Sequence, residues 1–267
     1  MLNSDTSGTK NRVLDSAEVI YATEGVEGLS LRTIAERANA NLAAINYHFR
    51  TKSALTEAML TRALGPLTEE SAHLLNLLQT EYGSNLQPVH ILAAMLLPII
   101  RELGMPQASL QAPPQTSLQP LPQTPPHRLQ FLQRTTTDQS PFVRQLMSNA
   151  FTVHTERFDK AFVQSFPAKS AVDAVLYFRL FCNALPGSLC NHNTFAICRL
   201  LVARPGTMPR DILLFFAMML NRCTLMPEAE MPRTDVHTTV DDIMRVLADT
   251  DTVSTLTAQF GSTHQAA

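Results

Sequence analysis

Residues 29–55 read LSLRTIAERANANLAAINYHFRTKSAL, and their apolar spacing is the strongest structural signal in the chain. Apolar side chains recur at helical spacing over 31–38, so we expect a short amphipathic helix there, with Ser30 as its N-cap. The pattern then breaks at Asn39, and asparagine accepts the left-handed conformation that a tight interhelical turn needs. A second short helix is predicted over 42–48.

The second predicted helix has two chemically different faces. Leu42, Ile45 and Phe49 share the apolar face. The other face carries Ala43, Ala44, Asn46, Tyr47 and His48. These side chains are small enough to enter the major groove of DNA and polar enough to contact base edges and phosphates there. The stretch therefore predicts a helix-turn-helix whose second helix reads DNA.

Two further helices are expected beside this pair. Residues 10–24 predict a supporting helix with a buried stripe, and Gly25 supplies a left-handed stop. Residues 54–64 predict another helix, which we expect to end at Gly65-Pro66. The supporting helix and the helix-turn-helix pair together predict a three-helix N-terminal domain.

Residues 10–55 resemble the N-terminal DNA-binding domain of the tetracycline-repressor-like (TetR) family of bacterial regulators. The elements that carry the resemblance are Gly25 through Ser30, Arg32, Ile34-Ala35, Tyr47-His48-Phe49, Lys52 and Leu55. Two positions depart from the family pattern, because Asn39 stands where many members have glycine and Asn46 stands where many have tyrosine. Asparagine also adopts the turn conformation, so the first departure is conservative. The second alters the predicted reading helix and leaves the recognised DNA sequence open.

The residues expected to contact DNA are Arg32, Thr33, Ala43, Ala44, Asn46, Tyr47, His48 and Lys52. Arg32 suits a guanine edge or a phosphate and Lys52 suits a phosphate clamp, although both are also typical of solvated surface charges. The alternative for Tyr47 is packing against the supporting helix. The alternative for Ala43 and Ala44 is that they are only small enough to let the helix approach DNA and make no base contact. Asn46 suits a bidentate bond to adenine, provided that the rotation of the helix presents it to DNA.

Composition narrows the class of protein. With 267 residues, 45% of them hydrophobic and 16% charged, and a net charge of −2, the chain is typical of an ordinary globular protein, so any positive charge that meets DNA must gather locally. No apolar run reaches the ~18–20 residues of a membrane span, and the first residues lack a hydrophobic signal core. The four cysteines predict neither a disulfide framework nor a zinc site. We therefore expect a cytoplasmic protein with no membrane partner.

The chain as a whole predicts an all-α fold, because alternation with period two is almost absent. We expect a flexible arm at 1–9, the helix-turn-helix domain at 10–55, a larger helical effector-binding and dimerisation domain at 56–250, and a flexible tail at 251–267. Helices in the larger domain are expected at 67–82, 89–103, 142–166, 171–185, 193–203 and 210–226. Prolines and glutamines crowd residues 105–126, so a mobile loop is expected over 105–140, with a polyproline II ligand as the alternative.

The resemblance implies that the larger domain forms a homodimer and encloses a pocket for a small-molecule effector. By position, 171–185 and 208–226 are the expected dimerising helices. An apolar pocket is expected to be lined by Met95, Leu96, Phe151, Phe158 and Tyr177, with His154 or Arg101 as an orienting polar group. A satisfied core histidine and an arginine that complements a helix dipole are the ordinary alternatives for the last two.

Together these patterns predict a dimeric DNA-binding regulator, a repressor that a small apolar ligand releases from palindromic double-stranded DNA. Control by a protein partner, or an enzyme housed in the C-terminal cavity, are the alternatives. The sequence contains no phosphate loop, nucleophile elbow, HExxH or scaffolded carboxylate pair, so we expect no catalytic residue, no metal and no cofactor.

Overall fold

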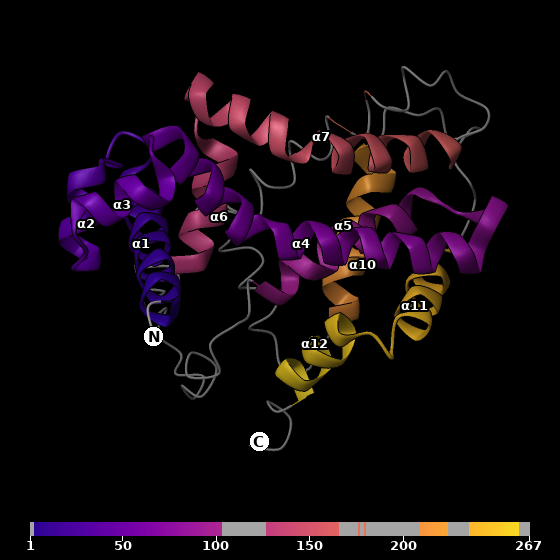
Figure 1. Cartoon of the computed structure of the whole chain (residues 1–267). Coiled ribbons are helices and arrows are strands. Elements are labelled where there is room, and N and C mark those ends of the chain that lie inside the picture. Colours follow the sequence, from indigo (N-terminus) through magenta and orange to yellow (C-terminus); the bar gives the residue numbers. More distant parts are fainter. Residues whose placement is uncertain are drawn as a thin grey trace, which may run out of the picture. The chain divides into compact units, whose positions relative to one another are not determined.

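The computed structural model describes residues 3–102, 127–165, 176, 179, 209–223 and 235–261, and these residues form helices without any strand (Figure 1). This confirms the predicted all-α class. In chain order the helices are α1 (Asn3–Glu24), α2 (Leu31–Ala38), α3 (Leu42–Phe49), α4 (Lys52–Tyr82), the 3₁₀ turn η1 (Gly83–Asn85), α5 (Pro88–Glu102), α6 (His127–Thr137), α7 (Pro141–Gln164), α10 (Pro209–Cys223), α11 (Val236–Val246) and α12 (Asp251–Gly261). The remaining predicted segments, including residues 105–126 and 193–203, lie outside the described residues.

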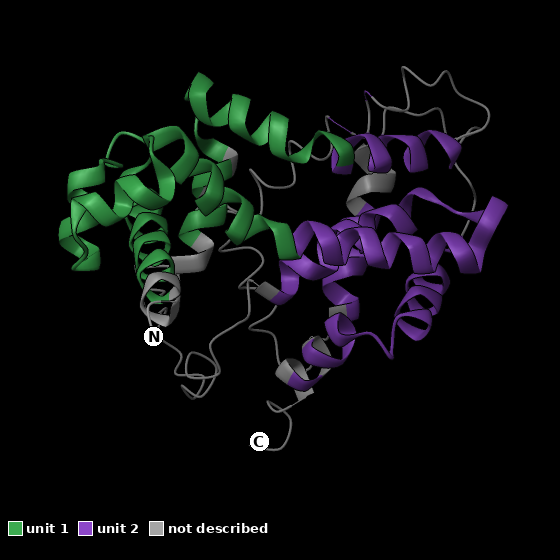
Figure 2. Ribbon diagram, viewed as in Figure 1, with its two compact units in different colours: residues 1–66, 122–153 green, residues 67–121, 154–267 purple. Residues whose placement is uncertain are grey.

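The chain divides into two compact units (Figure 2). Residues 1–66 and 122–153 form unit 1, whereas residues 67–121 and 154–267 form unit 2. Both α4 and α7 contribute residues to each unit. Unit 1 contains the predicted helix-turn-helix, and it is assembled from two separate pieces of sequence.

The supporting helix α1 organises unit 1. Its predicted buried stripe is confirmed, since Val13, Ala17, Ile20 and Tyr21 are all at most 2% exposed. Gly25, at φ +76°, ends the helix and donates its N–H to the carbonyl of Tyr21 at 2.9 Å. The helix begins earlier than expected, at Asn3, so the prediction of a flexible arm is wrong for most of residues 1–9. No proline interrupts this stretch, and helical propagation is easier than nucleation.

The expected stop at Gly65-Pro66 is wrong, because α4 runs without a break through Pro66. Proline removes one backbone donor from the helical ladder and crowds the preceding turn. The flanking Leu64 and Leu67 are both buried, whereas Pro66 itself is exposed. We attribute the continuity to this burial, which favours the helix on both sides of the proline and leaves the imperfect turn facing water.

A second difference lies within the expected 105–140 loop, where residues 127–137 form α6. Phe131 and Leu132 are only 1% and 8% exposed, and the ring of Phe131 meets that of Tyr21 edge-on at a centroid distance of 5.4 Å. Packing against α1 stabilises α6. The sequence did not predict this helix, because the Pro/Gln-rich residues upstream led to the expectation of a loop over the whole of 105–140. Likewise α12 occupies most of the expected flexible tail, anchored by buried Thr252 and Val253.

Unit 2 is built around α5, which packs against α10, α11 and α12. Helix α5 corresponds to the helix predicted over 89–103, and it is buried over most of its circumference. Its buried residues are Val89, His90, Ile91, Leu92, Ala93, Ala94, Leu96, Leu97 and Ile100. Among the described residues, no helix is both long enough and apolar enough to cross a bilayer.

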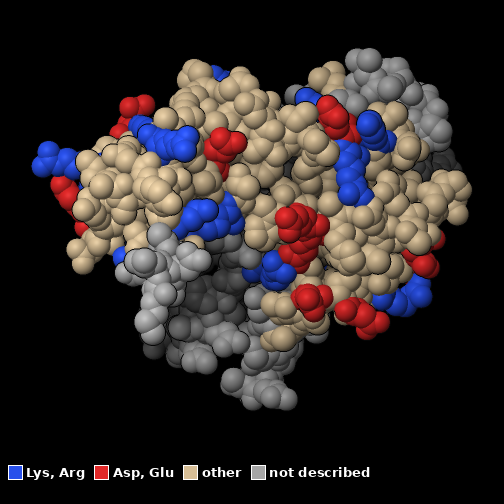
Figure 3. All heavy atoms as spheres, in the orientation of Figure 1, with Lys and Arg blue, Asp and Glu red and all other residues tan. Residues whose placement is uncertain are grey.

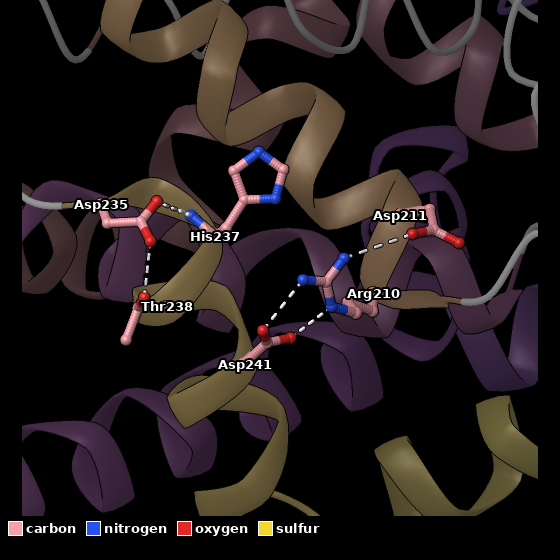
Figure 4. A network of polar contacts seen from close by, with 6 residues as sticks. All are labelled: Arg210, Asp211, Asp235, His237, Thr238 and Asp241. Carbon is pink, nitrogen blue, oxygen red and sulfur yellow. Dashed lines mark hydrogen bonds and ion pairs between the residues drawn. The ribbon is translucent and has the colours of Figure 1, made fainter.

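A polar network joins α10 to α11 in unit 2 (Figure 4). The Arg210 guanidinium makes two bonds to the Asp241 carboxylate, of which Nη2 to Oδ2 is 2.9 Å, and it also lies 3.5 Å from Asp211. Asp235 N-caps α11 by accepting from the backbone N–H of His237 at 3.1 Å and from the Thr238 hydroxyl at 2.6 Å. Asp241 therefore links α11 to α10.

Candidate nucleic-acid interface

Local side-chain caps fix the ends of the two short helices. The Ser30 hydroxyl accepts from the N–H of Thr33 at 3.0 Å and starts α2. Asn39 ends α2 in the left-handed conformation, with φ +46° and ψ +50°, as predicted from its tolerance of that region. Asn41 then caps α3, its side-chain oxygen accepting from the N–H of Ala43 at 2.9 Å. These three polar residues confirm the turn that the sequence indicated.

Burial fixes the rotation of α3. Ile45 and Phe49 are 0% and 4% exposed and anchor the helix in the core of unit 1. Ala43 and Asn46 are exposed, and Leu42 is 44% exposed. Leu42 was expected on the buried face, but it lies about 60° around an ideal helix from Ile45 and falls at the edge of the exposed face. The question left open for Asn46 is thereby answered, since its side chain faces solvent.

Tyr47 is the most prominent side chain of this face, at 77% exposure. This exposure contradicts the alternative in which Tyr47 packs against the supporting helix. Its ring meets that of His48 at a centroid distance of 5.4 Å. His48 and Ala44 are half-buried and border the exposed surface. The phenol is thus exposed to solvent, and the neighbouring imidazole meets its ring edge-on.

Arg32 and Thr33 occupy the first turn of α2, and both are exposed. The Arg32 Nε lies 3.0 Å from Glu36 Oε1, with side chains 87% and 66% exposed. Exposed pairs of this kind contribute about 0–1 kcal/mol, so a phosphate could displace the glutamate at little cost. The Thr33 hydroxyl shares a 2.6 Å hydrogen bond with Ser30.

Lys52, the expected phosphate clamp, has a structural role in unit 1. Its Nζ donates to the backbone carbonyl of Val26 at 2.8 Å, which ties the first residue of α4 to the loop after α1. An ammonium has three N–H donors, so this bond is compatible with a phosphate contact by the same group. The phosphate clamp stays a prediction.

A tight turn separates α3 from α4. Arg50 adopts φ +55° and ψ −42°, and the N–H of Thr51 lies 2.5 Å from the carbonyl of Phe49. This three-residue turn is rare for a residue with a side chain. It places Arg50 on the surface directly after α3. The sequence contained no signal for it.

An ion-pair cluster between α1 and α4 was also missed. Arg62 lies 2.5 Å from Glu18 and 2.8 Å from Asp15, and Glu18 is only 6% exposed. Both acids neutralise an arginine within unit 1. The face shown in Figure 3 carries Lys and Arg side chains interspersed with Asp and Glu, in keeping with the modest net charge.

The contact between α1 and α6 completes unit 1. The buried Tyr21 hydroxyl donates to Asp138 at 3.2 Å, and Arg134 Nη2 donates to the carbonyl of Thr23 at 3.0 Å. Burial raises the pKa of the Tyr21 hydroxyl, and the neighbouring Asp138 carboxylate adds to the rise. The phenol therefore stays neutral and acts as a donor that holds α6 on the supporting helix.

The residues expected to bind an effector are only partly brought together. His154 and Phe158 lie on α7 with ring centroids 4.6 Å apart, and burial lowers the pKa of His154. On α5, Leu96 is 1% exposed and Met95 is half-buried. Phe151 is half-buried, and Tyr177 lies outside the described residues. Arg101 Nη1 lies 2.6 Å from Glu70 Oε1, so a carboxylate of the chain already partners it. Among the described residues, no cluster of His, Cys, Asp and Glu could hold a metal ion.

The helix-turn-helix segment is similar in sequence to known proteins. Residues 13–59 match the family described as bacterial regulatory proteins, tetR family. The probable HTH-type transcriptional regulator YttP of Bacillus subtilis (strain 168) is 36% identical over 53 residues, which cover 20% of this chain and 26% of that protein. The aligned part thus spans about a quarter of the curated relative.

Two crystal structures from Rhodococcus are similar over longer stretches. A proposed TetR-family transcriptional regulator from Rhodococcus sp. has a TM-score of 0.41 and 16% identity, covering 69% of this chain and 88% of that chain. A transcriptional regulator from Rhodococcus sp. Rha1 has a TM-score of 0.45 and 15% identity, with coverages of 82% and 99%.

Proposed function

We propose that this chain, whose residues 13–59 match the tetR family of bacterial regulatory proteins, is a cytoplasmic transcriptional regulator that binds double-stranded DNA through α3. The observation that carries the proposal is the exposed face of α3. Ala43, Asn46 and Tyr47 face solvent from a helix whose opposite side is buried and whose two ends are capped. Small and polar side chains in this arrangement suit insertion into a major groove.

The surroundings of α3 supply groups suited to phosphates. Arg32 lies in the first turn of α2, whereas Arg50 and Lys52 follow α3, so cationic side chains precede and follow the proposed reading helix in the sequence. Phosphate contacts position a protein on DNA, and base contacts select the sequence. This division of roles agrees with the predicted set of DNA-binding residues.

The proposed regulator acts as a homodimer. Two copies would place their α3 helices in successive major grooves, about 34–36 Å apart, and would therefore recognise a palindromic site. The half-buried Leu214 and Phe215 and the 38% exposed Met218 on α10 are apolar side chains available for such an association. Residues 171–185 are the second proposed dimerising segment, and only Leu176 and Arg179 of this segment are described.

A small apolar effector is proposed to release the DNA. It would bind near Met95, Leu96 and Phe158, with His154 or Arg101 as a polar partner. Its influence on DNA binding can be no larger than its preference for the conformation that mismatches the two grooves. In this scheme the protein is a repressor.

The test uses the full chain and a random pool of duplexes. We expect repeated selection to enrich a near-palindromic sequence, and Tyr47→Ala to weaken binding to it by about 10- to 150-fold if the phenol donates to a phosphate. Because Tyr47 is 77% exposed, the truncation should leave the circular dichroism spectrum and the melting temperature unchanged. Val153→Ala, at an 81% exposed position on α7, is the matched control and should bind normally. Enrichment of no sequence, or full binding by Tyr47→Ala, would contradict the proposal.

A further inference from the structure

The exposed face of α3 has an unusual chemical make-up for a surface that reads DNA. Its four solvent-facing side chains are Leu42, Ala43, Asn46 and Tyr47. Leu42 and Ala43 are hydrocarbons, Asn46 is an amide and Tyr47 is a phenol. The whole helix, LAAINYHF, contains no Arg, Lys, Asp or Glu. Any base preference of this helix must therefore come from apolar, amide, phenol or imidazole groups, without a guanidinium, ammonium or carboxylate.

The major groove distinguishes the bases by atoms that match only some of these side chains. Guanine is read chiefly by arginine or lysine, and cytosine offers an amino group that an acidic side chain accepts. Adenine pairs bidentately with asparagine or glutamine through N6 and N7, and thymine presents a C5 methyl group to apolar side chains. The face of α3 thus carries partners for adenine and thymine and lacks the usual partners for guanine and cytosine.

The nearby cationic side chains lie outside α3. The helix itself therefore offers no arginine or lysine to guanine. Arg32 lies on α2 and pairs with Glu36 at 3.0 Å, and Lys52 lies on α4 and donates to the carbonyl of Val26. Arg50 follows α3, in the turn to α4. In helix-turn-helix complexes, the first turns of the second helix approach the base edges, and flanking residues meet the backbone.

The spacing of the two kinds of contact fits neighbouring base pairs. Ala43 and Asn46 are three residues apart, so they lie on the same side of α3 with a rise of about 4.5 Å between them. Successive bases on one strand are about 3.4 Å apart along the duplex. One amide contact and one methyl contact from α3 can therefore fall on adjacent base pairs.

We infer that α3 selects A·T base pairs, with the Asn46 amide bonded to N6 and N7 of an adenine and Leu42 and Ala43 packed against the C5 methyl group of a neighbouring thymine. This inference rests on the proposed function, because it presumes that α3 enters the major groove. It assigns base recognition to Asn46, and it names adenine as the base that this side chain recognises.

The experiment begins with the duplex selected by the full chain and alters single atoms of its half-sites. Replacing thymine by deoxyuridine removes only the C5 methyl group, and affinity should fall about fourfold per half-site. Replacing adenine by 7-deazaadenine removes the N7 acceptor, and affinity should again fall. Asn46→Ala should lower the preference for A·T over G·C at the contacted pair by about 5- to 150-fold and abolish the effect of 7-deazaadenine. Asn85→Ala, an exposed asparagine in η1, is the matched control and should retain both effects.

The outcomes separate this inference from the proposed function. Loss of affinity with both modified bases, and loss of the 7-deazaadenine effect in Asn46→Ala alone, would support A·T reading by α3. A selected duplex with G·C pairs in the half-sites, whose binding weakens in Tyr47→Ala but is insensitive to both modified bases, would overturn the inference and leave the proposed function standing. Failure of the selection to enrich any sequence would overturn both.

Discussion

His90 should make the stability of unit 2 depend on pH. It is 1% exposed, and its Nδ1 accepts from the backbone N–H of Gln87 at 2.8 Å, in the manner of a capping box at the start of α5. The neutral ring must carry its proton on Nε2, which is buried and has no hydrogen-bond partner among the described residues. The ring also lies 4.0 Å from that of Tyr82, centroid to centroid. Protonation would place a second N–H against a donor and a charge in an apolar core.

The size of the effect follows from the pKa. Burial lowers the pKa of His90 from 6.5 to about 4, although the nearby Asp242 opposes the shift. Below pH 6.5 the unfolded chain takes up a proton that the folded chain refuses until about pH 4, so stability falls as the pH falls through this window. The loss should be about 2 kcal/mol at pH 5 and should approach about 3 kcal/mol near pH 4.

Urea denaturation at pH 7.5 and pH 5, followed by circular dichroism, measures this loss. His90→Gln retains an acceptor for the Gln87 N–H but cannot titrate, so the free energy of unfolding of this variant should fall by about 2 kcal/mol less than that of the wild type. Tyr82→Phe is the control, because it keeps the neighbouring ring and removes only a hydroxyl that does not titrate in this range. Tyr82→Phe should lose as much as the wild type. If the free energy of unfolding of His90→Gln fell as much as that of the wild type between pH 7.5 and pH 5, the pH dependence would not come from the lowered pKa of His90. The argument from burial would then fail.

Three further predictions concern the proposed DNA-binding, dimer and effector sites. Lys52→Ala should weaken binding to all duplexes alike and lower the salt slope of log K by about 0.9 for each phosphate that is no longer neutralised. Lys160→Ala, at an exposed site on α7, is the control and should leave the slope unchanged. An unchanged slope for Lys52→Ala in fluorescence anisotropy titrations would show that Lys52 does not contact a phosphate. The full chain should sediment at twice its monomer mass at micromolar concentration, and Met218→Glu should lower that mass; a wild type that sediments as a monomer would rule out the two-groove scheme. If a cavity adjoins α5, Leu96→Trp should abolish the response to an inducer and leave the fold intact. In a packed core, the same change should lower the free energy of unfolding by about 1–3 kcal/mol. A destabilised variant that still responds to the inducer would place the pocket elsewhere.

The elements predicted best from the sequence are those whose ends depend on local chemistry. The bounds of α2 were predicted to the residue because Ser30 and Asn39 act on the backbone groups next to them. The whole turn between α2 and α3 is of this kind, and so is the left-handed stop at Gly25. Short-range hydrogen bonding and backbone preference suffice to locate such features.

The elements predicted worst depend on contacts between residues far apart in the chain. The burial of Leu64 and Leu67 maintains α4 through Pro66 against a local rule, and Phe131 stabilises α6 by meeting Tyr21, which lies far away in the sequence. The same holds within the candidate site. Periodicity indicated the residues of the α3 face, but only the depth of Ile45 and Phe49 in the core fixed the rotation that exposes Asn46.

The assembly of unit 1 from two pieces of sequence has a consequence for protein engineering. A gene fragment that stops at residue 66 would encode every helix of the helix-turn-helix motif but not α6, which covers α1. Tyr21 would be deprived of the ring of Phe131 and the carboxylate of Asp138, and its buried surface would face water. Grafting the proposed DNA-reading unit onto another protein therefore requires either that residues 122–153 be transplanted as well or that the recipient provide an equivalent helix.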